Sequence, residues 1–421
     1  MSSRPLPLHV LPFVALALSA CGDDPNRDGT GGGTAGSTSS PTGGSAASDD
    51  GGGGSASNAG GSATDGGSGL GGAPPVVVND CGELPPPGTF ELLQPPGVTD
   101  NFAFAVDPIN AGVVYVGTAQ QGIWKSTDCG SSWVHINTGR NGAVLDSGMN
   151  WTFVIDPYDS EVLYTNAGYG QTNNAYKSTN GGVDWDVVWP PPDGSFADVV
   201  EYNFTNVFAM DPADPTHLLL TFHAVCKPPY AESCIAETLD GGATWDVVDG
   251  DPEMVGTEGQ VIYFLDDAQT WLWASQSSGF WRTSNGGASW TQISPTLNEA
   301  HPQGSQIYRA ADGTFYVATA DGLARSADGA SWSLIPGTSP LAGGIVGDGT
   351  TLYLSNSFYW DWGSNLHPFF SAPEAGGEPW VELPGSPGMT SGGSLGLDQS
   401  HRILYSSTLS SGFWRITLPP K

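Results

Sequence analysis

Short runs of alternating apolar and polar residues fill the chain from Cys81 to Pro419, and Gly, Asn or Asp-Pro separates one run from the next. The first runs are Phe102–Val106, Val113–Gly117, Ile123–Ser126 and Trp133–Ile136. Alternation with a period of two residues predicts half-buried β-strands, and no helical period of useful length is visible. This part of the chain is therefore predicted to be all-β.

The same order of four strands recurs along the chain. An Asp-Pro turn or a related Asp turn joins the first two strands of a unit, and a longer turn ending in Trp joins the last two. A repeat of this length predicts one supersecondary unit per copy, stacked on its neighbours. The copies of the longer turn are Ser126–Trp133, Ser178–Trp185, Thr238–Trp245, Thr283–Trp290 and a shortened Ser326–Trp332.

The two ends of the repeat array complement each other. The sixth unit of four strands ends near Trp380, and a seventh unit, Leu395–Ile416, has only three strands. Thr89–Leu93 looks like the missing outer strand. A ring closed in this way leaves no exposed sheet edge. We therefore predict a single seven-bladed β-propeller of four-stranded antiparallel blades, closed by an N-terminal strand in the last blade. Six or eight blades are the alternatives, because the sixth unit lacks a clear turn motif.

The recurring turn resembles the Asp-box, or BNR repeat, of sialidases, xyloglucan-cleaving glycoside hydrolases, sortilin-type receptors and photosystem II assembly factors. The resemblance covers nearly the whole folded part and implies the fold, but one fold hosts many activities. In each turn an Asp or Asn side chain can accept backbone N–H bonds, and the Trp is expected to be buried between blades. These structural residues are Asp128, Trp133, Asn180, Trp185, Asp240, Trp245, Asn285, Trp290, Asp328 and Trp332.

The N-terminal part of the chain predicts a targeting signal followed by a flexible tether. Residues 1–21 read as a bacterial export signal that ends in Leu18-Ser19-Ala20-Cys21, which resembles a lipoprotein signal-peptidase box. We expect cleavage and acylation at Cys21, and Gly22 favours the outer membrane or cell surface of a Gram-negative bacterium. The alternative is an ordinary secretory signal with a chance Cys. Residues 22–76 are rich in Gly, Ser, Ala, Thr and Asp and predict a flexible tether, so the propeller comprises residues 77–421.

Four further cysteines predict two disulfides, because an exported protein passes an oxidising compartment. Strand order places Cys129 in a turn of the first blade. It places Cys81 just before the closing strand, which lies in the neighbouring blade on the same side of the ring. Cys226 and Cys234 flank one loop. We therefore predict the pairs Cys81–Cys129 and Cys226–Cys234. No metal is expected, since no metal-ligand spacing accompanies these residues.

Strand order divides the predicted ring into two sides. The Asp-box and Asp-Pro turns share one side, the box side. The second-to-third strand loops and the blade connections share the other, the loop side, where propellers usually bind ligands. Three loops there are enlarged: Gly168–Asn174, His223–Ser233 and Phe358–Phe370. The candidate ligand-binding residues on this side are Tyr169, Tyr230, Tyr359, Trp360, Asp361, Trp362, Asp146, Asp198, Glu201 and Arg140.

The cluster Tyr359–Trp362 is the sharpest local signal, because aromatic planes beside carboxylates suit sugar rings. The alternative is that these rings pack the long loop on itself. A sialidase needs three converging arginines, but Arg282, Arg325 and Arg415 occupy one repeat position and are expected to be scaffold. Arg309 and Arg402 fall near the Asp-Pro-type turns on the box side. Of the six arginines in the folded part, that leaves Arg140 on the loop side, which argues against a sialidase.

The formal net charge of −31 argues against nucleic acid and anionic lipid surfaces as partners. We expect a surface-anchored, monomeric propeller without cofactor that binds a glycan or protein and has no chemistry of its own. A glycoside hydrolase with paired carboxylates on the loop side stays open, since that chemistry needs only two carboxyl groups about 5–10 Å apart. An assembly or receptor-like factor is the third reading.

Overall fold

The computed structural model describes residues 74–256, 260–298, 306–338, 342–356, 368–384, 386, 393–408 and 412–421. They belong to one compact unit, Gly69–Lys421. Cys21, nearly all of the predicted tether, and the candidate residues Tyr359, Trp360, Asp361 and Trp362 lie outside the described residues. Within the described ranges, no helix has the length and apolar character needed to span a bilayer.

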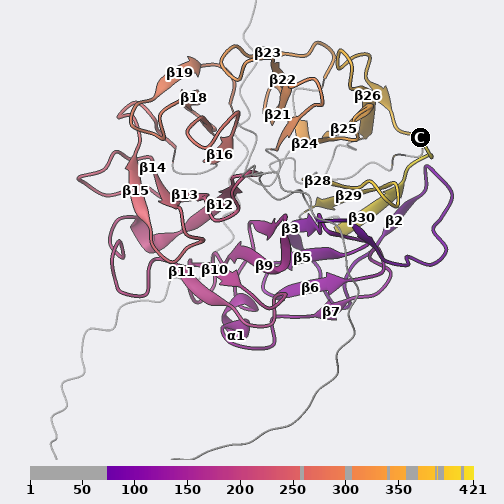
Figure 1. The fold of residues 1–421 in the computed structure, drawn as a ribbon, viewed down its shortest axis with the longest axis horizontal. Coiled ribbons are helices and arrows are strands. Elements are labelled where there is room, and N and C mark those ends of the chain that lie inside the picture. The colour runs from indigo at the N-terminus through magenta and orange to yellow at the C-terminus, as the bar shows by residue number, and fades with distance from the viewer. Residues whose placement is uncertain are drawn as a thin grey trace, which may run out of the picture. The chain divides into compact units, whose positions relative to one another are not determined.

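Seven four-stranded antiparallel sheets form a ring (Figure 1), so the predicted seven-bladed propeller is confirmed. Blade 1 is formed by β3 (Asn101–Val106), β5 (Val114–Thr118), β6 (Ile123–Ser126) and β7 (Val134–His135), and blade 2 by β8 (Phe153–Asp156), β9 (Asp159–Asn166), β10 (Ala175–Ser178) and β11 (Asp186–Trp189). Blade 3 is formed by β12 (Thr205–Met210), β13 (Leu218–Phe222), β14 (Cys234–Thr238) and β15 (Asp246–Asp249), and blade 4 by β16 (Val261–Phe264), β17 (Trp271–Ser275), β18 (Gly279–Thr283) and β19 (Thr291–Ser294). Blade 5 is formed by β20 (Ile307–Arg309), β21 (Phe315–Thr319), β22 (Gly322–Ser326) and β23 (Ser333–Leu334). Blade 6 is formed by β24 (Ala342–Gly347), β25 (Thr351–Asn356), β26 (Phe369–Pro373) and β27 (Val381–Glu382). Blade 7 is formed by β28 (Leu395–Asp398), β29 (Ile403–Thr408), β30 (Gly412–Thr417) and β2 (Phe90–Leu92).

The N-terminal strand β2 closes the ring as predicted. It pairs antiparallel with β30, with Phe90 opposite Ile416 and Leu92 opposite Trp414. A short parallel pair of β1 (Val77–Val78) with β4 (Asn110–Ala111) precedes it and was not foreseen. The described helical turns, α1 (Gly142–Leu145) and η1 (Glu201–Asn203), lie in the connections between blades 1 and 2 and between blades 2 and 3.

The box turns hold themselves together by local hydrogen bonds. In the first copy, the Ser126 hydroxyl accepts the amide of Gly130 at 2.7 Å, and the Asp128 carboxylate accepts the amide of Ser132 at 2.8 Å. Three other copies repeat both bonds, with Asn180, Asp240 and Asn285 in the place of Asp128. In the shortened fifth copy, Asp328 accepts the amides of Ala330 and Ser331. The acidic residues of the motif are thus used inside the turn.

Three box tryptophans contact an aromatic ring of the blade before their own. The ring of Trp245 lies 5.6 Å from that of Trp189 in the preceding blade, and Trp332 lies 5.4 Å from Phe280. Trp133 contacts Phe413 of blade 7 at 5.6 Å. Each pair is an edge-to-face contact between aromatic rings, which adds to the stabilisation from their burial. The hydrophobic core is therefore shared between blades rather than contained within each one.

A cation on the third strand links several blades to the next one. Lys177 donates to the carbonyl of Gly241, Arg325 to that of Gly376, and Arg415 to that of Cys129, each at 2.9 Å. In each case the carbonyl belongs to the turn between the third and fourth strands of the following blade. This recurring link explains why these cations share one repeat position.

Both predicted disulfides are present. Cys81–Cys129 has a Cα separation of 5.3 Å and joins the segment before β2 to the box turn of blade 1. Cys226–Cys234 has a Cα separation of 6.0 Å and closes one loop of blade 3. The first bond therefore acts at the closure of the ring, and the second acts within a single loop.

Acid is expected to weaken the box turns. Amides of Ser331 and Ala330 hold the pKa of Asp328 at about 2. Burial alone would raise the pKa of Asp128 and Asp240, but the hydrogen bonds in the turn outweigh it and both pKa values are lowered. Because these pKa values fall on folding, their stabilisation is complete above the ordinary value of 3.8 and is lost as the pH falls toward about 2.

The control for this prediction is already in the chain, since Asn180 and Asn285 occupy the same place in two other turns. Replacing Asp128, Asp240 and Asp328 by Asn keeps the acceptor and removes the titration. Urea unfolding followed by tryptophan fluorescence should show a smaller loss of stability for the triple variant than for the wild type between about pH 4 and pH 2. Equal losses would contradict the assignment.

Candidate ligand-binding site

Four aromatic rings meet on the loop side, where blades 2 and 3 adjoin. Trp151 and Phe204 precede the inner strands β8 and β12, while Tyr169 and His223 follow the second strands β9 and β13. We call these four residues the aromatic cluster. The Tyr169 ring lies 4.7 Å from Phe204 and 5.7 Å from Trp151, and His223 stacks on Phe204 at 4.7 Å.

The backbone around the aromatic cluster is held firmly. The Asn173 side chain accepts the amide of Tyr169 and donates to the carbonyl of Tyr202, so it joins the connection 168–174 to the connection before β12. A Cβ atom at Gly168 would overlap the rings of Phe204 and Trp151, so only glycine allows this close approach. Tyr169 and Tyr202 have φ angles of 52° and 56°, which bulky residues rarely adopt. Such strain is kept where the surroundings determine the conformation, often at binding sites.

Exposure differs sharply within this region. Trp151 and Phe204 are 5% and 8% exposed, whereas Tyr169 is 52% exposed and Tyr202 is 75% exposed. The buried rings therefore form a fixed support behind the Tyr169 ring, which faces solvent. An aromatic ring with a polar tip, ordered before its ligand arrives, binds flat amphipathic molecules at a low entropic cost.

The enlarged disulfide loop braces the neighbouring connection. Cys226 forms an antiparallel bridge with Val200, and the amide of Lys227 donates to the carbonyl of Val199. The amide of Glu201 donates to the carbonyl of Val225. The candidates Asp198 and Glu201 thus lie on a segment fixed by this loop; Asp198 is exposed and Glu201 is half-buried. Tyr230, also half-buried, packs against the core shared by blades 2 and 3.

Asp146 belongs to a different part of the loop side. Its carboxylate lies 2.8 Å from Nε2 of His135 and accepts the side-chain amide of Asn137 at 2.7 Å. His135 in turn contacts the ring of Trp124. These contacts tie the end of α1 to the outer strands of blade 1, so the carboxylate of Asp146 acts as a structural acceptor.

Arg140 does not lie on the loop side, where strand order placed it, but beside the box turn of blade 2. Its Nε is 3.1 Å from the carboxylate of Asp186, and its amide donates to Asp184 in the box turn of blade 2. The physical reason is that the chain leaving β7 crosses to the outer edge of the next blade before it turns back into α1. The charge of Arg140 is therefore paired with the scaffold.

The sequence pattern did not single out Trp151, Phe204 or Tyr202. Trp151 and Phe204 read as ordinary strand starts, and Tyr202 lies in a connection that was chosen for its carboxylates. The usable signal was positional, because both buried aromatics immediately precede inner strands of neighbouring blades.

A cluster of possible metal ligands has a structural explanation. Ligand atoms of Cys81, Cys129 and His401 lie within 4.8 Å of one another. However, the two sulfur atoms are bonded to each other. The His401 ring contacts the carboxylate of Asp398 at 2.8 Å and the carbonyl of Asn79 at 2.9 Å. His401 thus supports the turn beside the disulfide.

Three cavities formed by described residues all open on the box side. One of about 350 Å³ lies between the inner strands β12, β16 and β20, and one of about 600 Å³ lies beside β3 and β28. A third, of about 310 Å³, lies between blades 5 and 6. The box side therefore offers cavities in addition to its turns.

No family model matches the chain. In sequence it is similar to a xyloglucanase of Paenibacillus sp., with 28% identity over 275 residues that cover 55% of this chain and 26% of that protein. It is also similar to the xyloglucanase Xgh74A of Acetivibrio thermocellus, with 26% identity over 172 residues covering 36% and 20% of the two chains. The matched region is about a quarter or less of these relatives.

Solved structures share the fold. The GH74 enzyme of Niastella koreensis has a TM-score of 0.58 at 18% identity, covering 78% of this chain and 53% of that one. YCF48 from Cyanidioschyzon merolae has a TM-score of 0.53 at 12% identity, covering 78% and 98%. The chain is therefore an Asp-box-like β-propeller. The particular proteins that it resembles are xyloglucanases in sequence and, in fold, GH74 enzymes and YCF48.

Proposed function

We propose that this protein is a surface-anchored propeller that binds a neutral polysaccharide of the xyloglucan kind through the aromatic cluster on its loop side. The observation that carries the proposal is the Tyr169 ring, which is half-exposed and backed by Trp151 and Phe204. A pyranose ring offers an apolar face for such a platform and hydroxyl groups for the polar side chains around it.

Two further features support a polysaccharide ligand. Tyr202 is the most exposed aromatic side chain of the described residues, and Asn173 joins its backbone to the Tyr169 segment. Two exposed aromatics on joined connections suit a long ligand that contacts several points. The similarity to two xyloglucanases suggests which polysaccharides to try first.

A glycoside hydrolase is the second candidate, and the same sequence similarity favours it. The carboxylates of Asp198 and Glu201 would then be the residues to test, since the disulfide loop fixes their segment. An assembly or receptor-like factor remains a third reading, because YCF48 shares the fold. This third reading predicts binding to protein without binding to polysaccharide.

One experiment separates the three. The purified protein is run through native gels containing xyloglucan, mixed-linkage β-glucan or no polysaccharide, and reducing ends are measured in parallel. Retardation by a polysaccharide without new reducing ends is the expected result. New reducing ends that disappear in Glu201→Gln would establish the hydrolase instead. No retardation and no hydrolysis would overturn the proposal.

We also propose that acylated Cys21 anchors the propeller at the outer membrane or cell surface, as a monomer and without a nucleic-acid partner. The net charge of −31 supports the last point. Expressed with its leader in a Gram-negative host, the wild type should partition into the detergent phase of a Triton X-114 extract. Cys21→Ser should move it to the aqueous phase. Equal partitioning of both proteins would refute the anchor.

A further inference from the structure

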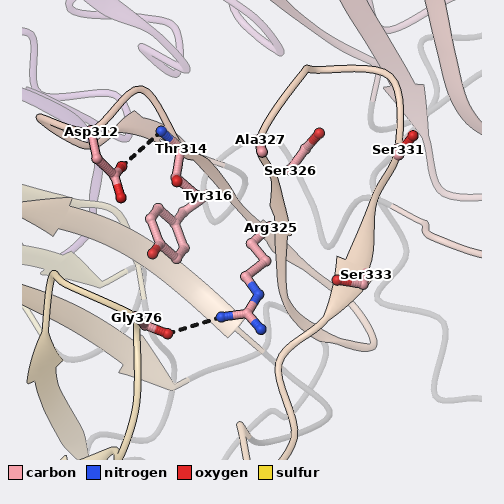
Figure 2. Close-up of a pocket in the computed structure, with 9 residues that line it drawn as sticks. All are labelled: Asp312, Thr314, Tyr316, Arg325, Ser326, Ala327, Ser331, Ser333 and Gly376. Atoms are coloured by element: carbon pink, nitrogen blue, oxygen red, sulfur yellow. Dashed lines mark hydrogen bonds between the residues drawn. The ribbon is translucent and has the colours of Figure 1, made fainter.

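The cavity between blades 5 and 6 is polar and opens on the side opposite the aromatic cluster. It has a volume of about 310 Å³, close to the lower end of the usual range for ligand pockets. Figure 2 shows Asp312 and Tyr316 on one wall and Arg325 and Ser333 on the other. Gly376 of the following blade forms its far edge.

The cavity lies where the second and third strands of blade 5 face the third-to-fourth-strand turn of blade 6. In blade 2, the cation Lys177 and the hydroxyl of Tyr164 both donate to the carbonyl of Gly241, at 2.9 Å and 3.1 Å. Both side chains are therefore hydrogen-bonded to the box turn of the next blade. In blade 5, Arg325 and Tyr316 hold the same strand positions, but blade 6 has no box motif to receive them.

Both side chains keep donors that no described residue accepts. One Arg325 nitrogen, Nη1, donates to the carbonyl of Gly376 at 2.9 Å, and Nε and Nη2 have no partner among the described residues. The Tyr316 side chain is only 2% exposed, and its hydroxyl likewise makes no hydrogen bond within the described ranges. Because Tyr316 lines the cavity, its hydroxyl is placed to donate to a molecule bound there.

The charges select the class of ligand. Burial, together with the charge of Asp312, raises the pKa of Tyr316, so its hydroxyl can donate at neutral pH. A hydrogen bond from the amide of Thr314 lowers the pKa of Asp312, so that carboxylate is ionised. One cation and one anion leave the cavity without net charge, and hydroxyl groups of Ser331 and Ser333 add both donors and acceptors. This combination suits a neutral polyol better than an anion or a cation.

We propose that this cavity is a second carbohydrate site, which takes one neutral pyranose ring. Arg325 and Tyr316 donate to hydroxyl oxygens of the sugar, and Asp312 accepts from a sugar hydroxyl. The site lies on a different side and uses no residue of the aromatic cluster. It therefore stands even if the loop side binds no polysaccharide.

The test uses the purified protein carrying Tyr169→Ala, so that the loop-side platform cannot mask the result. Titration with methyl β-D-glucopyranoside is followed by saturation-transfer NMR, with D-glucuronate and inorganic sulfate as anionic probes. We expect the glycoside to bind. Arg325→Met and Tyr316→Phe should each weaken it about tenfold, since each removes a hydrogen-bond donor to the sugar.

Lys125→Met is the matched control. Lys125 holds the same third-strand position in blade 1, where its Nζ lies 4.9 Å from the ring centre of Tyr115. It should leave binding of the glycoside unchanged, and circular dichroism should show that all variants are folded. The proposal is overturned if the glycoside does not bind, if Arg325→Met and Tyr316→Phe bind it as tightly as the Tyr169→Ala protein, or if an anionic probe binds more tightly.

Discussion

Replacing Cys81 and Cys129 together by Ala should lower the free energy of unfolding by about 4 kcal/mol. The bond spans 48 residues, so its loss frees a long loop in the unfolded chain. It also releases the segment before β2 in the folded state. That strand supplies the fourth strand of blade 7, and without it β30 would become an open edge.

The second disulfide is the control for this prediction. Cys226–Cys234 spans 8 residues, and the same loop argument gives about 2.5 kcal/mol. Guanidinium unfolding of both double-Ala variants should therefore place the Cys81–Cys129 variant at the lower midpoint. If the two variants unfold at the same midpoint, or the order is reversed, the Cys81–Cys129 bond does not contribute more to the free energy of unfolding than Cys226–Cys234, and the prediction is wrong.

Other contacts at the closure limit how far the loss can go. Arg415 is 5% exposed; its Nε donates to the carboxylate of Glu91 at 2.7 Å and its Nη1 to the carbonyl of Cys129 at 2.9 Å. These bonds hold β2 and the first box turn independently of the sulfur atoms. The double-Ala variant should thus remain folded at 25 °C, which makes its midpoint measurable.

The fold could be predicted because each repeat carries its own local instructions. The side chain of Asp128 accepts an amide inside its own turn, so the motif is complete within a few residues. Strand order then assigns every turn to one side of the ring. The closing strand Phe90–Leu92 followed from counting, since the last unit lacked one strand.

The candidate site could be predicted only in part, because it forms between repeats. Tyr169 was singled out by its enlarged loop, but Trp151 and Phe204 look like ordinary strand starts until blades 2 and 3 lie side by side. Arg140 shows the same limit. Strand order indicates where a connection begins and ends, but not that it crosses to the box turn of the next blade on the way.

Arg325 illustrates a more general reason. Its repeat position correctly indicates a link to the next blade, and the link to Gly376 is present. The repeat position does not determine how many donors of such a cation are used, because Nε of Arg282 in blade 4 is buried without a partner among the described residues although blade 5 has a box turn.

Tyr169→Ala should raise the dissociation constant for the polysaccharide that retards the wild type by about tenfold to a hundredfold. The ring is the exposed face of the aromatic cluster, and Phe204 at 4.7 Å and Trp151 at 5.7 Å hold it in place. Because the ring is ordered before binding, its loss removes contact area without any saving in entropy. Affinity electrophoresis over a range of polysaccharide concentrations measures the change.

Tyr158→Ala is the matched control, since Tyr158 is 42% exposed and lies in the turn between β8 and β9 on the box side. It removes a tyrosine of similar exposure from the same blade and should leave the dissociation constant unchanged. Tyr169→Phe should retain most of the affinity if stacking dominates, because the ring and its supports are kept. If Tyr158→Ala weakens binding as much as Tyr169→Ala, or if neither weakens it, the platform on the loop side is not the binding site.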